Sequence, residues 1–204
     1  MPRPAMTREQ ADRTRADLLD VAQRLFESDG LDGMSFRAIA SASGCSPTKP
    51  YSYFASKADL VDGLRVRAYE WIRDVLVAAA STATDPIDAL RALAHAYVHA
   101  GIDRPRMYAL LYSAEGAMPE TEPRLLDAKM AALNVCQGVI EAAADTGALD
   151  LATDPETAAH TFWVGAHGLV SLELGGFLVV GRSVDDLLDP IVTILIEGLK
   201  EVPA

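Results

Sequence analysis

Residues 25–64 read LFESDGLDGMSFRAIASASGCSPTKPYSYFASKADLVDGL, and this stretch carries two short helical patterns on either side of a glycine. Ser35 can accept a hydrogen bond as the N-cap of the first helix. Gly44 supplies the positive φ that a tight turn requires. Ser46 and Pro47 suit the N-cap and the first position of a second helix. The order helix, glycine turn, helix predicts a helix-turn-helix.

The second helix of such a unit enters the major groove of DNA, and its first side chains approach the base edges. Hydroxyl, phenol and ammonium groups there can donate hydrogen bonds to phosphates and bases. The residues predicted to contact DNA are Arg37, Ser46, Pro47, Thr48, Lys49, Tyr51, Ser52, Tyr53 and Lys57. Pro50 disfavours the α conformation at the residue before it, so an irregular first turn is expected. Taken alone, the same Ser/Pro/Tyr-rich stretch is also compatible with a surface loop.

Helical patterns separated by Gly, Pro and small polar residues fill the rest of the chain, and no sustained two-residue alternation indicates strands. Helices are predicted at residues 14–29, ending at Gly30, and at 35–43, 46–54, 56–80, 86–100, 105–112, 123–146, 155–178 and 184–201. The predicted fold class is therefore all-α, with about nine helices.

Acidic charge is concentrated away from the predicted helix-turn-helix. The 204 residues carry a net charge of −11, although DNA binding favours basic surfaces. Residues 1–57 contain eight Lys or Arg against seven Asp or Glu, whereas residues 58–204 contain ten against twenty-two. The acidic remainder can confine DNA binding to one end of the molecule, or can serve only to keep the protein soluble.

The composition indicates a globular protein: half of the residues are apolar and 23% are charged. Only two cysteines are present, Cys45 and Cys136, without the CxxC spacing of a zinc site, so a reducing cytoplasm is expected. The N-terminal residues lack the apolar run of an export signal, and no later run has the length of a membrane span. We therefore expect no membrane partner.

The run from Arg15 to Leu64 resembles the DNA-binding domain of the tetracycline-repressor (TetR/AcrR) family. The residues that match in order and at family spacing are Phe26, Gly30, Ser35, Ile39, Ala40, Gly44, Ser46, Tyr51, Phe54, Lys57 and Leu60. The sequence departs from the commonest pattern at Cys45, Thr48, Pro50 and Tyr53, where many members have Val, Gly, Leu and His. These departures affect individual base contacts and leave the resemblance of the whole module intact.

The resemblance implies a three-helix DNA-binding domain followed by a helical domain for ligand binding and dimerisation. The division expected is a flexible arm at residues 1–13, the DNA-binding domain at 14–57 and the second domain at 58–204. Such a protein is a transcription regulator, expected to be a repressor that binds a palindromic operator as a homodimer. An apolar or amphipathic small-molecule effector releases it from DNA, and no cofactor is implied.

The C-terminal half carries Trp163, His167 and Gly168, which are similar to the Trp-x-x-x-His-Gly signature of one C-terminal subtype of the family. Small residues in this helix allow close helix approach, and the last helix has an apolar stripe. Two such helices from each subunit can form a four-helix interface. The residues predicted for the dimer interface are Leu169, Leu172, Phe177, Leu187, Leu188, Ile191 and Leu195. The alternative is that these stripes only close the core of the monomer.

A ligand pocket needs apolar walls with a few polar groups, and the second half offers aromatic, sulfur and imidazole side chains. The residues predicted to line it are Trp71, Tyr97, Met107, Tyr108, Leu111, Tyr112, Met130, Cys136, Trp163 and His167. Side chains of these kinds also fill ordinary cores. His167 stands out because an imidazole on an apolar helix needs a hydrogen-bond partner.

Three other functions have weaker support in the sequence: metal binding, catalysis and protein–protein adaptation. His95 and His99 have the spacing of two metal ligands, but the segment lacks the Glu of HExxH, so no metal site is expected. Nucleophile-elbow, Walker and dinucleotide-binding motifs are absent from the sequence, so an enzyme is not expected. A protein–protein adaptor that keeps the helix-turn-helix as a scaffold stays possible, and the salt dependence of DNA binding would distinguish it.

Overall fold

The structure is a computed structural model that describes residues 7–113, 122–179 and 181–200. These residues form eight α-helices and one 3-10 helix, in agreement with the all-α class expected from the sequence. The helices are α1 (Arg8–Gly33), α2 (Phe36–Ala42), the 3-10 helix η1 (Pro50–Ser52), α3 (Lys57–Ala80), α4 (Pro86–Asp103), α5 (Pro105–Leu111), α6 (Pro123–Asp145), α7 (Pro155–Leu174) and α8 (Val184–Gly198).

Helix α1 begins earlier than the sequence pattern suggested. Thr7 and Gln10 form a capping box, in which each side chain accepts a hydrogen bond from the other residue's backbone N–H. The expected arm over residues 1–13 is therefore too long, because residues 8–13 are helical; residues 1–6 lie outside the described residues. At the other end Gly30 has φ 72° and interrupts the helix, at the residue where the helix was expected to stop.

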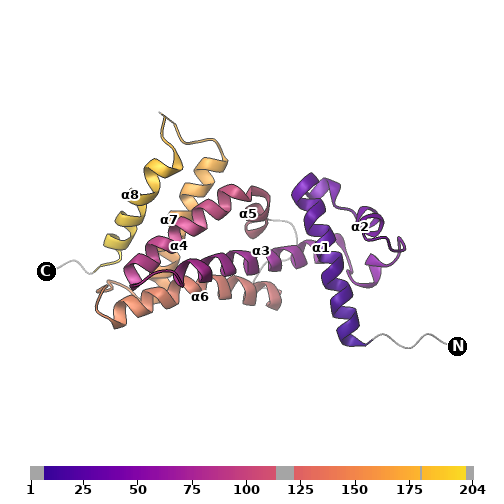
Figure 1. The fold of residues 1–204 in the computed structure, drawn as a ribbon, viewed down its shortest axis with the longest axis horizontal. Coiled ribbons are helices and arrows are strands. Elements are labelled where there is room, and N and C mark those ends of the chain that lie inside the picture. The colour runs from indigo at the N-terminus through magenta and orange to yellow at the C-terminus, as the bar shows by residue number, and fades with distance from the viewer. Residues whose placement is uncertain (1–6, 114–121, 180, 201–204) are drawn as a thin grey trace.

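Helices α1, α2 and η1 form one end of the molecule, and α3 carries the chain from it into the remaining helices (Figure 1). Ser56 caps α3 by accepting a hydrogen bond from the backbone N–H of Asp59 at 3.1 Å. Along its length α3 packs against α1, α4, α5 and α6. The helix therefore contacts both ends of the molecule.

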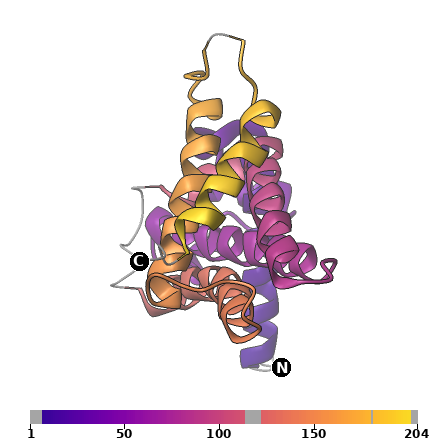
Figure 2. The same ribbon diagram turned by 90° about the vertical axis from the view of Figure 1, so that its left-hand side faces the viewer.

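Helices α7 and α8 lie side by side at the end of the molecule opposite α1 and α2 (Figures 1 and 2). Gly165 permits their close approach, because a Cβ there would lie 2.5 Å from a methyl carbon of Leu195. Helix α4 packs between this pair and α3, and α6 covers α3, α4 and α7. The core is continuous, with fully buried side chains from Ile39 at one end to Leu149 near the other.

Candidate DNA-binding and effector sites

The segment predicted as a continuous helix from Ser46 is instead a turn followed by η1. The backbone N–H of Lys49 donates to the carbonyl of Ser46 at 3.0 Å, and that of Phe54 donates to the carbonyl of Pro50 at 3.0 Å. Lys49 keeps α-helical angles, φ −60° and ψ −45°, although a proline follows it. The segment thus winds like a helix without one regular hydrogen-bond pattern, and Pro50 is the reason, since it has no N–H to donate.

Buried side chains anchor this segment and leave its predicted contact residues outside. Phe54 and Pro50 are buried, and Phe54 stacks on Phe36 at 6.3 Å. Tyr51 is 64% exposed and meets Phe36 edge-on, with ring centroids 4.6 Å apart. The exposed members of the predicted set are Arg37, Ser46, Pro47, Thr48, Lys49, Tyr51, Ser52 and Lys57, and Tyr53 is half-buried.

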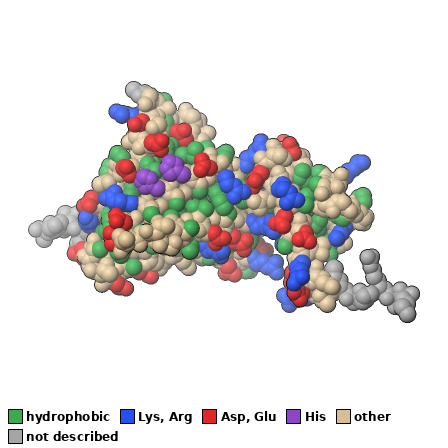
Figure 3. All heavy atoms as spheres, in the orientation of Figure 1, with side chains coloured by type: hydrophobic (Ala, Val, Ile, Leu, Met, Phe, Trp, Pro, Cys, Tyr) green, Lys and Arg blue, Asp and Glu red, His purple; other side chains and the backbone are tan. Residues whose placement is uncertain are grey.

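Lys57 has a structural contact that the sequence did not indicate. Its ammonium donates to the backbone carbonyl of Leu31 at 2.9 Å, which ties the start of α3 to the last turn of α1, just after Gly30. Arg15 makes a second tie: its guanidinium pairs with Asp59 at 3.1 Å and lies over the Phe54 ring at 4.7 Å. These contacts hold residues 46–54, which we call the reading segment, against α1 and α3. Cationic and anionic side chains are intermingled over this end of the molecule (Figure 3).

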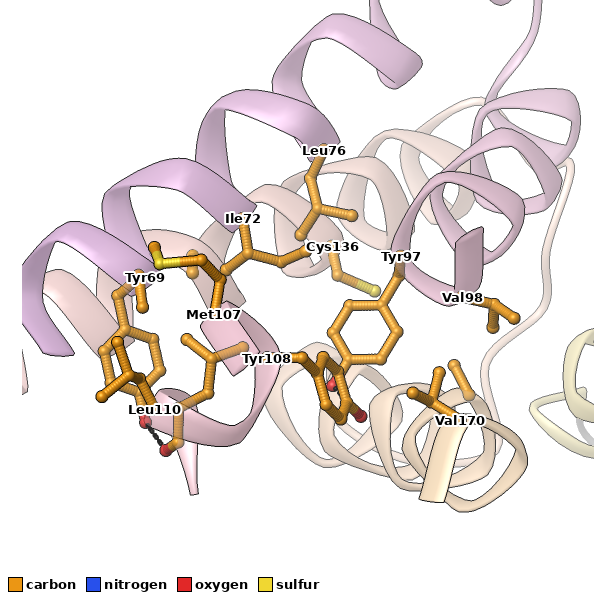
Figure 4. Close-up of a cluster of buried hydrophobic side chains, with 14 of the residues drawn as sticks. Tyr69, Ile72, Leu76, Tyr97, Val98, Met107, Tyr108, Leu110, Cys136 and Val170 are labelled. Atoms are coloured by element: carbon orange, nitrogen blue, oxygen red, sulfur yellow. Dashed lines mark hydrogen bonds between the residues drawn. The ribbon is translucent and has the colours of Figure 1, made fainter. Parts of the chain in front are cut away.

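The second site is a partly open cavity of about 80 Å³ lined by α3, α4, α6 and α7 together with the end of α5. Its lining residues are mostly apolar: Tyr69, Ile72, Leu76, Leu93, Ala94, Tyr97, Leu111, Tyr112, Lys129, Ala132, Leu133, Cys136, His160, Phe162, Trp163 and Ala166. Figure 4 shows part of this region, with Ile72 and Leu76 from α3 and Tyr97 from α4 around Cys136. Burial raises the pKa of Cys136 to about 12, so its thiol stays protonated at neutral pH.

Half of the residues predicted for a ligand pocket line this cavity. These five residues are Tyr97, Leu111, Tyr112, Cys136 and Trp163. The other five do not: Trp71, Met107, Tyr108, Met130 and His167. The reasons are local, since Met107 is buried in the core and Trp71 lies under the Arg104 guanidinium at 5.0 Å.

The sequence pattern missed several lining residues. Helical spacing alone does not say which apolar side chains border a cavity. It therefore does not distinguish Ile72, Leu93 and Phe162 from other core residues. Lys129 and His160 were missed as well, because polar side chains on a helix usually face solvent.

Tyrosines and one histidine are joined by hydrogen bonds along one wall of the cavity. The Trp163 indole donates to the hydroxyls of Tyr97 and Tyr112, at 3.0 and 3.1 Å. The Tyr97 hydroxyl also bonds to those of Tyr112 and Tyr108, and Tyr108 bonds to His167 Nδ1 at 2.6 Å. Burial raises the pKa values of the three tyrosines and lowers that of His167, so all four groups are neutral near pH 7.

The outer face of α7 and α8, with the segment that joins them, carries exposed apolar side chains among polar ones. Phe177 and Ile194 are each 69% exposed, and Leu172 and Val164 are exposed as well. Two residues predicted for the dimer interface, Leu169 and Leu188, are instead buried inside the subunit at 2% exposure. The reason is helical periodicity, because Leu188 shares the inward face of α8 with Val192 and Ile196. Leu187, Ile191 and Leu195 are half-buried beside them.

One histidine of the pair on α4, His95, bonds to a side chain of α8. His95 Nε2 lies 2.8 Å from a carboxylate oxygen of Asp189 on α8, and the His99 ring is 6.1 Å from the His95 ring. In the described part of the chain, no three His, Cys, Asp or Glu side chains gather as a metal site requires. No helix in the described ranges has the length and apolar character needed to span a membrane.

Two family models match the chain. Residues 18–64 match bacterial regulatory proteins of the tetR family, and residues 90–195, more than half of the chain, match the tetracyclin repressor-like C-terminal domain. The HTH-type transcriptional repressor KstR2 of Mycobacterium tuberculosis is 29% identical over 119 residues, which are 56% of this chain and 57% of that repressor. The chain therefore spans little more than half the length of this relative.

Solved structures share the fold over nearly the whole chain. A protein of unknown function from Rhodococcus sp. RHA1 superposes with a TM-score of 0.79 and 26% identity, over 92% of this chain and 95% of that one. The regulator FadR from Bacillus subtilis, solved with stearoyl-CoA, gives a TM-score of 0.69 at 14% identity, over 90% and 98% of the two chains. With both family models matched and the helix-turn-helix in place, the chain belongs to the tetracycline-repressor (TetR) family of DNA-binding transcription regulators.

Proposed function

We propose that the protein is a homodimeric repressor that occupies a palindromic operator in the cytoplasm and leaves it when a small molecule enters the cavity. The observation that carries this proposal is that α3 and α5 contact both the cavity wall and α1. A ligand that displaces these helices displaces the reading segment with them. In the dimer, the distance between two reading segments then no longer matches the half-sites.

The proposed effector contact surface is the lining of the cavity, and the proposed DNA contact surface is the exposed face at Ser46–Ser52 with Arg37. We place the boundary between the two units at the start of α3, because α1, α2 and η1 pack together at one end. KstR2 is named a repressor, and the FadR fold holds stearoyl-CoA in B. subtilis; both facts fit a repressor with an apolar effector.

The proposed dimer uses the exposed apolar face of α7 and α8. Two copies of this helix pair related by a twofold axis would bury Phe177, Leu172 and Ile194 in a four-helix contact. A single subunit reads only one short half-site, so dimerisation is also what gives the protein useful specificity.

Selection of bound fragments from random DNA tests the proposal. We expect the purified full chain to enrich a short inverted repeat, and its affinity for that repeat to fall steeply as salt rises, because phosphate contacts release counterions. If no inverted repeat is enriched, the proposal that the protein binds a palindromic operator is wrong. Binding that does not change with salt would instead favour the protein–protein adaptor.

A further inference from the structure

The hydrogen-bonded groups along the cavity wall form one chain from Tyr112 to Ser171. Tyr112 bonds to Tyr97, Tyr97 to Tyr108 at 3.1 Å, and Tyr108 to His167 Nδ1 at 2.6 Å. On the far side of the ring, His167 Nε2 lies 3.2 Å from the hydroxyl of Ser171. Only Tyr97 and Tyr112 of this chain line the cavity, so the chain has one end at the ligand space and the other at the α7 surface.

Counting protons divides the arrangements of this chain into two kinds, according to whether His167 Nδ1 accepts or carries a proton. Each tyrosine has one O–H proton, and a neutral imidazole has one N–H. If His167 Nδ1 accepts, every phenol proton points toward His167, and Tyr112 has none left for a ligand. If His167 Nδ1 carries the proton, one phenol O–H is left over, and an acceptor in the cavity draws it to Tyr112, which reverses every bond. Without a ligand the first arrangement is favoured, because every phenol O–H then has an acceptor, while the exposed Ser171 hydroxyl, which accepts from Nε2, can donate to water.

The charged groups at the cavity favour a ligand that accepts hydrogen bonds. Such a ligand stabilises the second arrangement, in which the Tyr112 O–H is free to donate. Lys129 is the one lining residue with a full positive charge, and none of the described lining residues is Asp or Glu. His160 also lines the cavity, and its Nδ1 lies 2.9 Å from the carbonyl of Glu156, which leaves its Nε2 toward other partners. Such a wall repels a cation and attracts an oxygen acceptor.

We propose that the effector has an apolar body and a carbonyl or carboxylate oxygen that accepts the Tyr112 O–H, and that its binding switches His167 to the form protonated at Nδ1. This inference rests on the proposed function, because it assumes that a small molecule occupies this cavity. The apolar body contacts Ile72, Leu93 and Phe162, and the oxygen lies beside Tyr112 and Trp163.

Three probes with the same tail and different head groups test this: 2-octanone, octanoate and octylamine. Calorimetric titration of the full chain should show that the ketone or the carboxylate binds more tightly than the amine. Tyr112→Phe removes the donor and should weaken that acceptor by about 3- to 10-fold, the usual effect of one hydrogen bond. The matched control is Tyr69→Phe, since Tyr69 lines the same cavity and its hydroxyl donates to the Leu111 carbonyl, outside the chain.

Two further measurements separate the possible outcomes. Lys129→Met should weaken octanoate and leave 2-octanone unchanged, which tells a carboxylate effector from a neutral carbonyl one. Nitrogen-15 NMR of the His167 ring, assigned with His167→Gln, should show Nδ1 gaining a proton when an acceptor probe binds. The proposal is overturned if octylamine binds as well as the acceptors, if Tyr112→Phe weakens all three equally, if the ring nitrogens do not change, or if no probe binds.

Operator affinity measured in the same samples keeps the two proposals apart. If 2-octanone binds with the expected Tyr112 and His167 effects while operator affinity stays constant, the hydrogen-bond chain is supported and effector-controlled release is the idea that fails. If octylamine alone releases DNA, release stands and the acceptor proposal fails.

Discussion

Pro50 and Tyr51 are adjacent residues with opposite environments, and together they explain how a 3-10 helix can present side chains to DNA. Pro50 is buried, and its missing N–H prevents the regular α-helical bonding of this segment. Tyr51 lies outside, braced at its ring by Phe36. The buried proline fixes the direction of the turn, and the exposed neighbours are free to serve as contact residues.

Lys49→Ala should weaken operator binding without lowering the thermal stability. Lys49 is exposed and lies in the reading segment, where its ammonium can meet a phosphate. Losing one phosphate contact should reduce the slope of log affinity against log salt by about 1, which fluorescence anisotropy of labelled operator measures. Lys200→Ala removes the same charge on the far side of the molecule and should leave the slope unchanged. An unaltered slope in Lys49→Ala would remove this residue from the interface.

The free energy of unfolding should fall as the pH drops, in part through His167. Burial lowers the pKa of His167 in the folded state, so below the unfolded value protons bind the unfolded chain more strongly. The associated stability is fully present above the unfolded pKa and is lost as the pH falls through it toward the folded pKa. Denaturant unfolding between about pH 7.5 and about pH 5 should show a smaller loss in His167→Gln than in the natural protein. Equal losses in both proteins would contradict this assignment.

Lys57 illustrates what the sequence could not show at the residue scale. A cation next to the reading segment favours a phosphate contact, but the acceptor that it bonds is the Leu31 carbonyl, 26 residues earlier. Backbone carbonyls leave no mark in a sequence, so only the folded structure reveals this contact. The capping pair Thr7 and Gln10, in contrast, was readable, because a Thr followed three residues later by Gln is the usual signal.

At the scale of elements, α5 occupies the position between the cavity and α1. Its C-terminal residue Leu111 lines the cavity. At its other end Arg104 pairs with the carboxylate of Glu27, and Arg106 donates to the Glu27 backbone carbonyl. Seven residues therefore connect the ligand space with the end of α1.

Glu27→Gln should leave operator affinity near its natural value and reduce the effect of an effector on it. The side-chain pair is partly exposed, so its loss should change stability by less than about 1 kcal/mol. Coupling between effector and operator should fall by about 0.5–2 kcal/mol, the usual range for residues between two sites. Operator titrations with and without effector measure this coupling.

Glu141→Gln is the matched control, since Glu141 is exposed on α6, which is not among the helices that pack on α1. If the two variants couple effector and operator equally well, α5 does not carry the signal through Glu27.

Helix boundaries were largely predictable, and the form of the reading segment was not. Pro86, Pro105, Pro123 and Pro155 each open a helix in the structure at the residue where the sequence placed it. At Pro50 two tendencies compete: the family spacing favours a helix from Ser46, and the proline opposes it. Their balance depends on the burial of Pro50 where η1 packs on α2, which the local pattern of the segment does not contain.

At the scale of the whole molecule, the exposed apolar face of α7 and α8 sets the proposed assembly. Gly168 lies on this helix pair, and a Cβ added to it would meet no atom within 4 Å. The space beside Gly168 is therefore open in the subunit, and the proposed dimer would fill it with the second subunit. Periodicity picked out the two helices proposed for this face, but the list of predicted interface residues did not separate the leucines of α8 that point inward from those at its edge.

Gly168→Arg should produce a folded monomer with weak DNA binding. The open space accepts the side chain in one subunit, whereas two arginines would meet across a twofold axis. Sedimentation should show the monomer, and operator affinity should fall to the about 1–100 μM range of non-specific binding. Gly138→Arg, at an equally open glycine on α6, should stay dimeric. A dimeric Gly168→Arg protein would place the interface elsewhere.

The cavity between α3, α4, α6 and α7 has a consequence for the speed of the response. Its volume of about 80 Å³ is well below the roughly 300–1,000 Å³ of pockets that hold drug-sized ligands. A larger effector fits fully only when the surrounding helices move apart, so this movement, and not the encounter in solution, limits its binding. The observed association rate would then level off at high effector concentration, and the delay between the arrival of the effector and the release of DNA would be a property of the protein itself.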